Sequence, residues 1–438
     1  MNRTPFLLSA IVFAAVAALS YFLLRERMED TEAAYFELAR LSPDTLTVAY
    51  PPDTTVLVPG GTGWRLIHPV RDRADEIAVE ALLKRLRDLR AGRRFPLVPE
   101  KLDTYGFRYP QAMIRAAYAD RHPPDTLWIG GFTMDAGRHY VRAGSSPEVA
   151  LVESRTVKTY LLKDTVALRY TQLIPFHEAR AEALVIRDRG GTIVTRVEKR
   201  GDGWWITHPY PGPADDRRVL NYLASLSHMQ VTEFLRETVE DWTPFGLVPP
   251  RVSVAVATST GDTVRTFLGD RAGDLAYARD PRREALLGVA ANYPAVLLRG
   301  SDPLREPLLQ PFGIRDVDSL RVETPGKPPV VWTSEAWSGV DRESPLGSVL
   351  EHWFGAKAEA FAPADPSRLG SLGFPAGRLV WWGEGDTLMV VERGRAADGR
   401  IPVRSVSGRG SRPGEILFFS VEPAGVLWDF LARGDGGS

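Results

Sequence analysis

The amino-acid sequence repeats itself, and this repetition constrains the fold more than any other feature of the chain. Trp64 and Pro69 return 140 residues later as Trp204 and Pro209, and the same offset holds over almost fifty residues without a gap. The other matched pairs are Ala74 and Ala214, Asp75 and Asp215, Leu83 and Leu223, Leu86 and Leu226, Tyr105 and Phe245, Gly106 and Gly246, and Pro110 and Pro250. Self-similarity at a fixed period indicates one structural unit copied in tandem.

A third copy, more degenerate than the first two, follows toward the C-terminus. The Leu-Gly-Phe-Pro sequence at residues 372–375 matches the Tyr-Gly-Phe element at residues 105–107 and the proline that follows it. Trp337 stands for Trp64, although the His-Pro dipeptide found in the other two copies is missing.

Each copy begins just after a joint that is itself repeated. Residues 168–176 resemble residues 304–312, and an alternating β-rich stretch follows each of them, so a strand should open each copy. We therefore divide the chain into a membrane anchor at residues 1–30 and three copies at residues 44–167, 181–303 and 317–432, of which the last is degenerate.

The first copy is predicted to be mainly antiparallel sheet. Residues 46–50 and 55–58 are β-rich runs separated by a Pro-Pro-Asp turn, which is typical of a hairpin. Residues 64–67 form a further strand that ends at Pro69, because proline has no amide hydrogen to donate to a neighbouring strand. Shorter β-rich runs occur at residues 114–118, 127–129, 140–141 and 150–152.

One main helix is expected in each copy. In the first copy, Asp75 is placed to accept a hydrogen bond from a free amide at the start of the helix. Ile77, Leu82, Leu86 and Leu89 recur with helical spacing and predict its buried stripe. The predicted fold class is therefore α+β: an N-terminal transmembrane helix, then three tandem copies, each a mainly antiparallel sheet with one main helix.

A hydrophobic stretch at residues 6–24 predicts a single membrane-spanning helix. The stretch carries no charge, and a helix of this length spans ~28 Å, close to the ~30 Å thickness of the hydrocarbon layer. Its large apolar side chains are Phe6, Ile11, Phe13, Leu19, Phe22 and Leu24. A cleaved signal peptide is the alternative, but the apolar region of such a peptide is normally shorter.

Composition places the rest of the chain among ordinary globular proteins and excludes several kinds of site. Of the 438 residues, 44% are hydrophobic and 25% are charged. The net charge of -1 gives no sign of a nucleic-acid partner, whose polyanionic backbone attracts basic proteins. The chain has no cysteine, which excludes disulfides, thiolate metal sites, thiol nucleophiles and a lipoprotein anchor.

The repeated histidines are the first candidates for chemistry, but their context favours a structural role. His68 and His208 each precede a proline at a strand end, and the aspartate seven residues on is the expected helix cap. His177 opens a zinc-like sequence in which Ala181 replaces the second histidine. The glycine-rich and G-x-S-x-G motifs of common enzymes do not occur. We therefore predict no catalytic residues, metal or cofactor.

A basic run is the first of two candidate binding features. It comprises Lys84, Arg85, Arg87, Arg90, Arg93 and Arg94, is assigned to the helix of the first copy, and lies opposite much of the leucine stripe. The second copy has uncharged residues at the matching helix positions, so the feature belongs to one copy only. Such a run is ordinarily a solvated face, and it is also suited to anionic lipid or an anionic wall polymer.

Adjacent tryptophans are the second candidate. Neighbouring side chains in a strand point to opposite faces, so one member of each pair should be partly exposed. Trp205, next to Trp204, and Trp382, next to Trp381, are the proposed partner surface, because exposed aromatic side chains mark binding surfaces.

The repeated pattern resembles the uncharacterised family catalogued as domain of unknown function 4340. Trp64, Pro69, Ala74, Asp75, Leu83, Leu86, Tyr105, Gly106 and Pro110 carry the resemblance, together with their counterparts in the second copy. The resemblance covers most of the chain after residue 44, and the degenerate third copy departs from the pattern.

The resemblance to this family implies a role and a location. Its members typically have an N-terminal membrane helix and a repeated extracytoplasmic region, and many are associated with gliding-type ABC transport systems. The resemblance thus implies a single-pass protein of the inner (cytoplasmic) membrane that contacts ABC permease and ATPase subunits. The charges that flank residues 6–24 are a weak and slightly contrary indication of orientation.

The predicted function is a non-catalytic, membrane-anchored accessory protein of an envelope ABC-type transport system, acting through protein–protein contacts. Two alternatives stay open. One is a module that binds envelope glycan or lipid through exposed tryptophans, and the other is an enzyme of a type that the known motifs do not cover.

Overall fold

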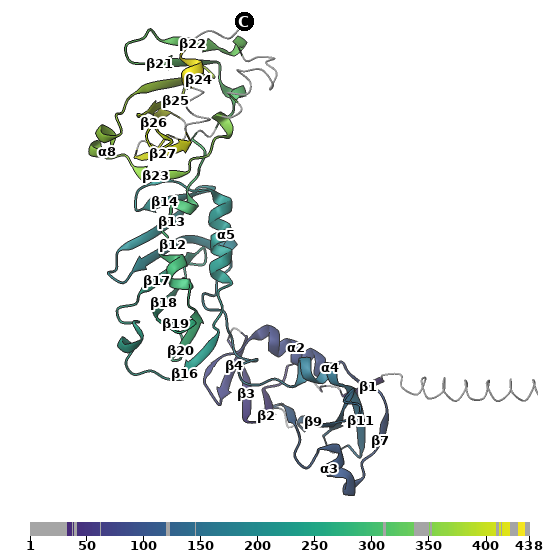
Figure 1. Ribbon diagram of the computed structural model, residues 1–438. Coiled ribbons are helices and arrows are strands. Elements are labelled where there is room, and N and C mark those ends of the chain that lie inside the picture. The colour runs from purple at the N-terminus through teal and green to yellow at the C-terminus, as the bar shows by residue number, and fades with distance from the viewer. Residues whose placement is uncertain are drawn as a thin grey trace, which may run out of the picture. The chain divides into compact units, whose positions relative to one another are not determined.

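The computed structural model describes most of the chain after residue 32 (Figure 1). The described residues are 33–36, 38, 42–61, 63–119, 123–144, 146–309, 312–336, 350, 353–408, 411–412, 414–420 and 428–433. The predicted anchor at residues 6–24 and the predicted third-copy Trp337 lie outside them. Within the described ranges, no helix has both the length and the apolar character that crossing a membrane requires.

The chain divides into two compact units. The N-terminal unit, Met1–Thr171, holds one large antiparallel sheet, and the C-terminal unit, Gln172–Ser438, holds two. The described part of the protein is therefore mostly antiparallel β with a few short helices. The predicted antiparallel sheets are confirmed, whereas helices contribute less than an α+β fold implies.

The sheet of the N-terminal unit has nine strands in the order β5-β4-β3-β2-β8-β9-β10-β11-β7. Its strands are β2 (Thr45–Tyr50), β3 (Asp53–Gly60), β4 (Gly63–His68), β5 (Asp72–Arg73), β7 (Arg94–Pro96), β8 (Ala112–Ala117), β9 (Asp125–Phe132), β10 (Arg138–Ala143) and β11 (Glu148–Glu153). The predicted hairpin is β2 with β3, in which Tyr50 pairs with Asp53. A separate two-stranded sheet pairs β1 (Ala33–Phe36) with β6 (Leu89–Ala91).

The main helix of this unit is α2 (Glu76–Arg87), and its start is the predicted one. The amide of Ala78 donates to the Asp75 carboxylate over 3.0 Å, which satisfies one of the free amides at the helix start. The predicted stripe is wrong in two places. Ile77 is 82% exposed, because the buried face begins at Val79, and Leu89 is buried from β6, after the helix has ended.

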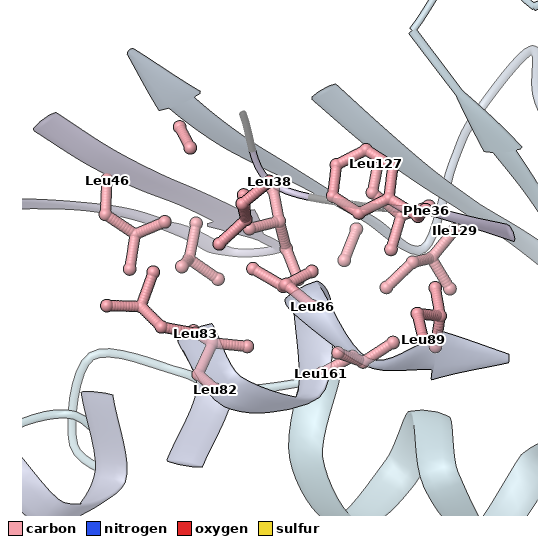
Figure 2. Packing of buried hydrophobic residues seen from close by; sticks show 14 of the residues in the cluster. Phe36, Leu38, Leu46, Leu82, Leu83, Leu86, Leu89, Leu127, Ile129 and Leu161 are labelled. Atoms are coloured by element: carbon pink, nitrogen blue, oxygen red, sulfur yellow. The ribbon is translucent and has the colours of Figure 1, made fainter. Parts of the chain in front are cut away.

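The hydrophobic core of the N-terminal unit lies between α2 and the sheet. Figure 2 shows Leu82, Leu83 and Leu86 of the helix directed toward side chains of the strands, among them Leu46, Leu127 and Ile129. Two residues from the chain before β2, Phe36 and Leu38, fill the space between these layers. Further short helices in this unit are η1 (Pro99–Lys101), α3 (Leu102–Tyr105), α4 (Ser154–Thr156) and η2 (Val157–Leu161).

The second sheet follows the same plan in the order β15-β14-β13-β12-β17-β18-β19-β20-β16. Its strands are β12 (Ala181–Asp188), β13 (Ile193–Arg200), β14 (Gly203–His208), β15 (Gly212–Pro213), β16 (Glu233–Arg236), β17 (Val252–Thr258), β18 (Thr263–Ala272), β19 (Leu275–Arg279) and β20 (Leu286–Ala290). Helix α5 (Asp216–Ser227) covers one face, as Figure 1 shows, and Asp215 accepts from the amide of Arg218 at its start.

The third sheet has seven strands in the order β22-β21-β24-β25-β26-β27-β23, which is the order of the second sheet without its first two strands. Its strands are β21 (Ser319–Glu323), β22 (Val330–Thr333), β23 (Ala360–Pro363), β24 (Gly377–Gly383), β25 (Asp386–Arg393), β26 (Arg400–Gly408) and β27 (Glu415–Ser420). A short helix, α8 (Pro366–Ser371), precedes β24. The three sheets match the three predicted copies in number, and the predicted copy boundaries stay predictions.

A close backbone approach explains why the Tyr-Gly element recurs. Gly106 adopts a φ of 74°, a conformation that favours glycine, and this turn brings the carbonyl of Tyr105 onto β9. A Cβ at Gly130 would lie only 2.1 Å from that oxygen. In the second sheet, a Cβ at Gly269 would lie 2.1 Å from the carbonyl oxygen of Phe245. The repeated element is thus a packing device of the fold.

Candidate functional site

The repeated His and Asp residues are used by the backbone. Asp75 and Asp215 cap α2 and α5, as described above, and His68 and His208 end β4 and β14 immediately before a proline. The structural interpretation of the aspartates as helix caps is confirmed by their hydrogen bonds to helix amides.

His177 lies at the edge of a hollow of about 410 Å³ in the C-terminal unit, together with Phe176, Glu178, His228 and Gln230. Both histidines make short-range contacts with the backbone. His177 Nδ1 accepts from the amide of Ala179 over 3.2 Å, and His228 Nδ1 lies 2.6 Å from the carbonyl oxygen of Ala224. In the described ranges, no three His, Cys, Asp or Glu side chains are grouped to hold a metal ion.

The predicted tryptophan pairs divide between core and surface. Trp204 is 6% exposed and Trp381 is 1% exposed, so both belong to hydrophobic cores. Trp205 and Trp382 are partly exposed. They lie on β14 and β24, in different sheets, so the structure does not combine them into one repeated site. Their role as a partner surface stays a prediction.

Trp205 has the more distinctive surroundings of the two. Its cross-strand neighbours are Glu198 on β13 and Pro213 on β15. The guanidinium of Arg200 lies 5.7 Å from the centre of its ring. An aromatic face beside a cation and a carboxylate is suited to a polar ligand that stacks, such as a sugar.

A buried His–Ser pair occurs in the N-terminal unit, and no sequence pattern predicts it. His139 is fully buried on β10, and its Nδ1 lies 3.0 Å from the hydroxyl of Ser154. That hydroxyl also bonds the carbonyl oxygen of Ala136 over 2.8 Å. Burial, with a smaller effect of Lys158, lowers the pKa of His139. Because both residues are shielded from solvent, the pair fits a structural link between β10 and α4 better than a nucleophile.

The joints between the repeated sheets contain buried ion pairs. In the N-terminal unit, Arg169 Nε lies 2.6 Å from a carboxylate oxygen of Asp72, and both side chains are almost fully buried. The backbone of the joint is held as well. Ala74 forms an isolated antiparallel β-bridge with Arg169, and the amide of Asp75 donates to the carbonyl of Leu168.

The joint of the C-terminal unit contains the equivalent arginine, Arg305, with a different partner. The backbone contacts are the same as in the first joint. Ala214 forms an isolated antiparallel β-bridge with Arg305, and the amide of Asp215 donates to the carbonyl of Leu304. The carboxylate, however, comes from Glu415 on β27 of the third sheet. Arg305 Nη1 and Glu415 Oε1 are 2.7 Å apart, and neither side chain is exposed to solvent.

A glycine makes this exchange of partners possible. In the first sheet, Asp72 on β5 pairs with Leu66 on β4. In the second sheet, Gly212 on β15 pairs with Ile206 on β14, so Gly212 stands at the position equivalent to Asp72. A Cβ at Gly212 would lie 2.7 Å from Arg305 Nη1 and 3.3 Å from the carboxylate oxygens of Glu415. The space left by the missing aspartate is therefore filled by a carboxylate from the following sheet.

Further contacts complete this assembly, which we call the Arg305 cluster and define as Tyr210, Arg305, Arg412 and Glu415. Arg305 Nη2 donates to the carbonyl of Tyr210 over 2.8 Å, and its guanidinium lies 3.7 Å from the centre of the Tyr210 ring. Arg412 Nη1 contacts Glu415 over 3.3 Å. Arg412 also donates to the backbone carbonyls of residues 306 and 308. Burial raises the pKa of Glu415, and the two guanidinium groups oppose that rise.

A second buried carboxylate lies within the third sheet. Glu392 on β25 is 3% exposed and contacts Arg378 and Arg404 over 2.7 Å each. Burial by itself raises the pKa of Glu392, but the hydrogen bonds and charges of the two arginines outweigh burial, so the pKa is lowered.

The predicted basic run is not confined to the helix. Lys84, Arg85 and Arg87 lie on α2, Arg90 lies on β6, Arg93 lies just before β7, and Arg94 is the first residue of β7. Lys84, Arg90, Arg93 and Arg94 are exposed. We call the six side chains the basic face.

Comparison with known proteins supports the repeat. The model of a family described as a domain of unknown function, DUF4340, matches residues 64–205 and again residues 204–372. The two matched segments meet at the repeated tryptophan rather than at the joints. No curated protein matches the chain.

Proposed function

The chain belongs to the DUF4340 family, and from that premise we propose that it is a non-catalytic, membrane-anchored accessory protein of an envelope ABC-type transport system. Residues 6–24 would span the inner membrane once, with the described part of the chain on the extracytoplasmic side. Its partners would be the permease and the ATPase subunits or proteins bound to them.

The observation that carries this proposal is that the repeated residues have structural tasks. Trp204 packs in the core, Asp75 and Asp215 cap helices, and Gly130 and Gly269 admit a backbone carbonyl. Residues that recur in every copy of a catalytic or ligand-binding repeat would be expected at a surface instead. The repetition therefore supports a scaffold whose surfaces meet protein partners.

The Arg305 cluster adds to this support. A buried pair between β27 and the joint before it resists separation, because parting Arg305 and Glu415 would take each buried charge away from its closest counter-charge. Two sheets held in a fixed relationship present one preformed surface, which reduces the ordering cost of binding a partner.

Photo-crosslinking in cells tests the proposal. We would place a photoreactive residue in the full chain at one exposed apolar position of each sheet region: Met134, Leu220 or Val331, which are 107%, 40% and 60% exposed. After detergent extraction, the captured proteins would be identified by mass spectrometry. The same residue at the buried position Leu127 is the matched control.

Capture of an ABC permease or its ATPase from at least one exposed position, and from none at Leu127, is the expected result. The capturing position would identify the sheet in contact. Capture of wall-modifying or lipid-modifying proteins alone would refute the transporter link.

The surroundings of Trp205 favour one second candidate, a module that binds envelope glycan. Its partly exposed ring lies beside Arg200 and Glu198, as described above. Binding of the purified protein to wall polymers, lost on Trp205→Ala and retained on Trp382→Ala, would establish this candidate. The absence of binding by the unaltered protein would remove it.

A further inference from the structure

We propose that the basic face of the N-terminal unit binds the anionic headgroups of the membrane in which the chain is anchored. This inference rests on the proposed anchor at residues 6–24 and adds a second, electrostatic contact between the folded region and the lipid surface. The contact would set which side of the N-terminal unit is turned toward the membrane.

The first argument is where the chain enters the fold. The first described strand after the predicted anchor is β1, and it pairs directly with β6 of the basic face. In this pairing Ala34 lies opposite Arg90. Tyr35 also lies on β1, and the guanidinium of Arg94 is 5.2 Å from the centre of its ring.

This entry point is held firmly. The hydroxyl of Tyr35 donates to the carbonyl of Glu148 and accepts from the amide of Ala143, each over 3.2 Å. Phe36 and Leu38 are buried in the core, where Figure 2 shows them between α2 and the sheet. The position of β1 is therefore a fixed part of the N-terminal unit.

The second argument is reach. Eight residues, 25–32, separate the predicted anchor from β1. At ~3.5 Å per residue, even a fully extended segment of this length spans only about 30 Å. A surface that adjoins β1 is thus held within about 30 Å of the bilayer, close enough for the basic face to reach the lipid headgroups.

The third argument is charge. Residues 84–94 contain six basic side chains and one acidic side chain, Asp88, which lies 3.2 Å from Arg87. Arg155 and Lys158, both exposed on α4 and η2, lie on elements next to this segment, because η2 packs against α2. Clusters of four to eight Lys or Arg beside a membrane segment are typical of binding to anionic lipid.

The fourth argument is that only this copy carries the charge. The positions 140 residues later are Ala224, Ser225, Ser227, Gln230, Glu233 and Phe234. The fold of the second copy is therefore built without a basic face, so the fold itself does not require one. The feature occurs only in the copy that adjoins the anchor.

The chain also offers a rival occupant of the basic face. Residues 25–32 include Glu26, Glu29, Asp30 and Glu32, whose carboxylates are close enough in sequence to reach it. We favour the lipid because the bilayer presents many anionic headgroups, whereas the segment also carries Arg25 and Arg27. The experiment separates the two.

The test measures how closely the basic face approaches the headgroups. Because the chain has no cysteine, Ala81→Cys on the exposed side of α2 gives a single labelling site in the full chain. The labelled protein would be reconstituted into phosphatidylcholine vesicles, with or without phosphatidylglycerol. Energy transfer to headgroup-labelled lipid would report the ratio of docked to undocked N-terminal units.

We expect phosphatidylglycerol to increase energy transfer, and salt to reverse the increase as the Debye length falls from ~10 Å at 0.1 M to ~3 Å at 1 M. Each basic group near an anionic surface is worth about a fivefold change in the docked ratio. The triple variant Lys84→Gln, Arg90→Gln and Arg93→Gln should therefore lower that ratio about 100-fold.

The matched control changes the same charge elsewhere. Arg217, Arg265 and Arg299 are exposed in the C-terminal unit, and their replacement by Gln should leave the effect of phosphatidylglycerol unchanged. Equal loss in this control would overturn the proposal, since net charge and not the basic face would then decide docking.

Three further outcomes would overturn the proposal and identify the reason. If energy transfer is the same with and without phosphatidylglycerol, in chains that remain bound to vesicles at high salt, lipid binding by the basic face would be refuted and the proposed anchor would stand. An effect of phosphatidylglycerol that arises only after Glu29→Gln, Asp30→Asn and Glu32→Gln would assign the face to the chain's own acidic segment. Chains that do not remain with the vesicles at high salt would refute the anchor, and the inference with it.

Discussion

Arg305 and Glu415 are 110 residues apart in sequence, yet their guanidinium and carboxylate groups meet at 2.7 Å where neither side chain is exposed to solvent. The equivalent Arg169 pairs with Asp72, which is supplied by the same unit. The arginine at this repeated position therefore has two roles. Arg169 pairs within its own unit, whereas Arg305 links the second sheet to the third. The second copy has Gly212 at the position equivalent to Asp72, and this leaves room for Arg305 to pair with Glu415.

Removing the carboxylate should weaken the C-terminal unit strongly. Glu415→Gln is expected to cost about 3–5 kcal/mol, because Arg305 and Arg412 lose the buried carboxylate that they share, and Arg305 keeps only the exposed Asp302 at 3.3 Å. Hydrogen exchange of the β27 and β15 amides would measure this, and 3 kcal/mol corresponds to acceleration of more than about 100-fold. The matched control is Glu359→Gln, which breaks an ion pair with Arg400 whose side chains are about half exposed, 47% and 49%, and should cost less than about 1 kcal/mol. Equal effects of the two variants would contradict the argument.

Gly212→Asp should reproduce the first joint only when Glu415 is absent. In the unaltered chain the new Cβ would lie 2.7 Å from Arg305 Nη1, so the variant is expected to lose about 1–3 kcal/mol. In a Glu415→Ala chain the new carboxylate would replace the missing one, and Gly212→Asp should restore part of the lost stability. A double-mutant cycle by urea unfolding measures this coupling. A cost that is the same in both backgrounds would refute the equivalence of Asp72 and Glu415.

Glu392 should make the third sheet sensitive to acid. Its pKa in the folded protein is lowered, so its contribution to stability is present above the pKa of an unfolded Glu, ~4.3, and is lost as the pH falls through the lower folded value. Glu392→Gln should reduce stability at pH 7 by about 2–4 kcal/mol and flatten the loss below pH ~4.3. Unfolding measured at several pH values, with Glu359→Gln as the exposed control, tests this. An unchanged acid profile would count against the assignment.

Two adjacent glycines should respond very differently to alanine. Gly130→Ala places a Cβ 2.1 Å from the carbonyl oxygen of Tyr105, so the turn and β9 must separate, at an expected cost of about 3 kcal/mol or more. A Cβ at Gly131 has as its nearest neighbour the same oxygen at 3.8 Å, which is ordinary contact. Gly131→Ala should therefore cost about 1 kcal/mol or less. Thermal unfolding of the two variants, followed by circular dichroism, would compare them, and similar midpoints would show that the approach can relax.

Several structural features were determined by the sequence alone, because they depend on neighbours in the chain. The β2–β3 hairpin follows from β-rich runs around a Pro-Pro-Asp turn, and the starts of α2 and α5 follow from Asp75 and Asp215, whose side chains bond amides three residues on. The repeat itself follows from matched residues, and it predicts sheets of one kind. Ile77 has the helical spacing of a buried residue but is exposed, because apolar spacing does not determine which side of the first helical turn faces the core.

Only the tertiary structure decided which charges are paired and which surfaces adjoin. Arg169 and Arg305 recur in the sequence and Asp72 becomes Gly212, but no local pattern points from Gly212 to Glu415, which lies two hundred residues further on. The pairing of β1 with β6, which brings the basic face beside the entry of the chain, is equally invisible, since strand pairing between distant segments depends on the packed core. Propensity and capping act within a few residues, whereas buried charge is paired by whichever group the completed fold brings within reach.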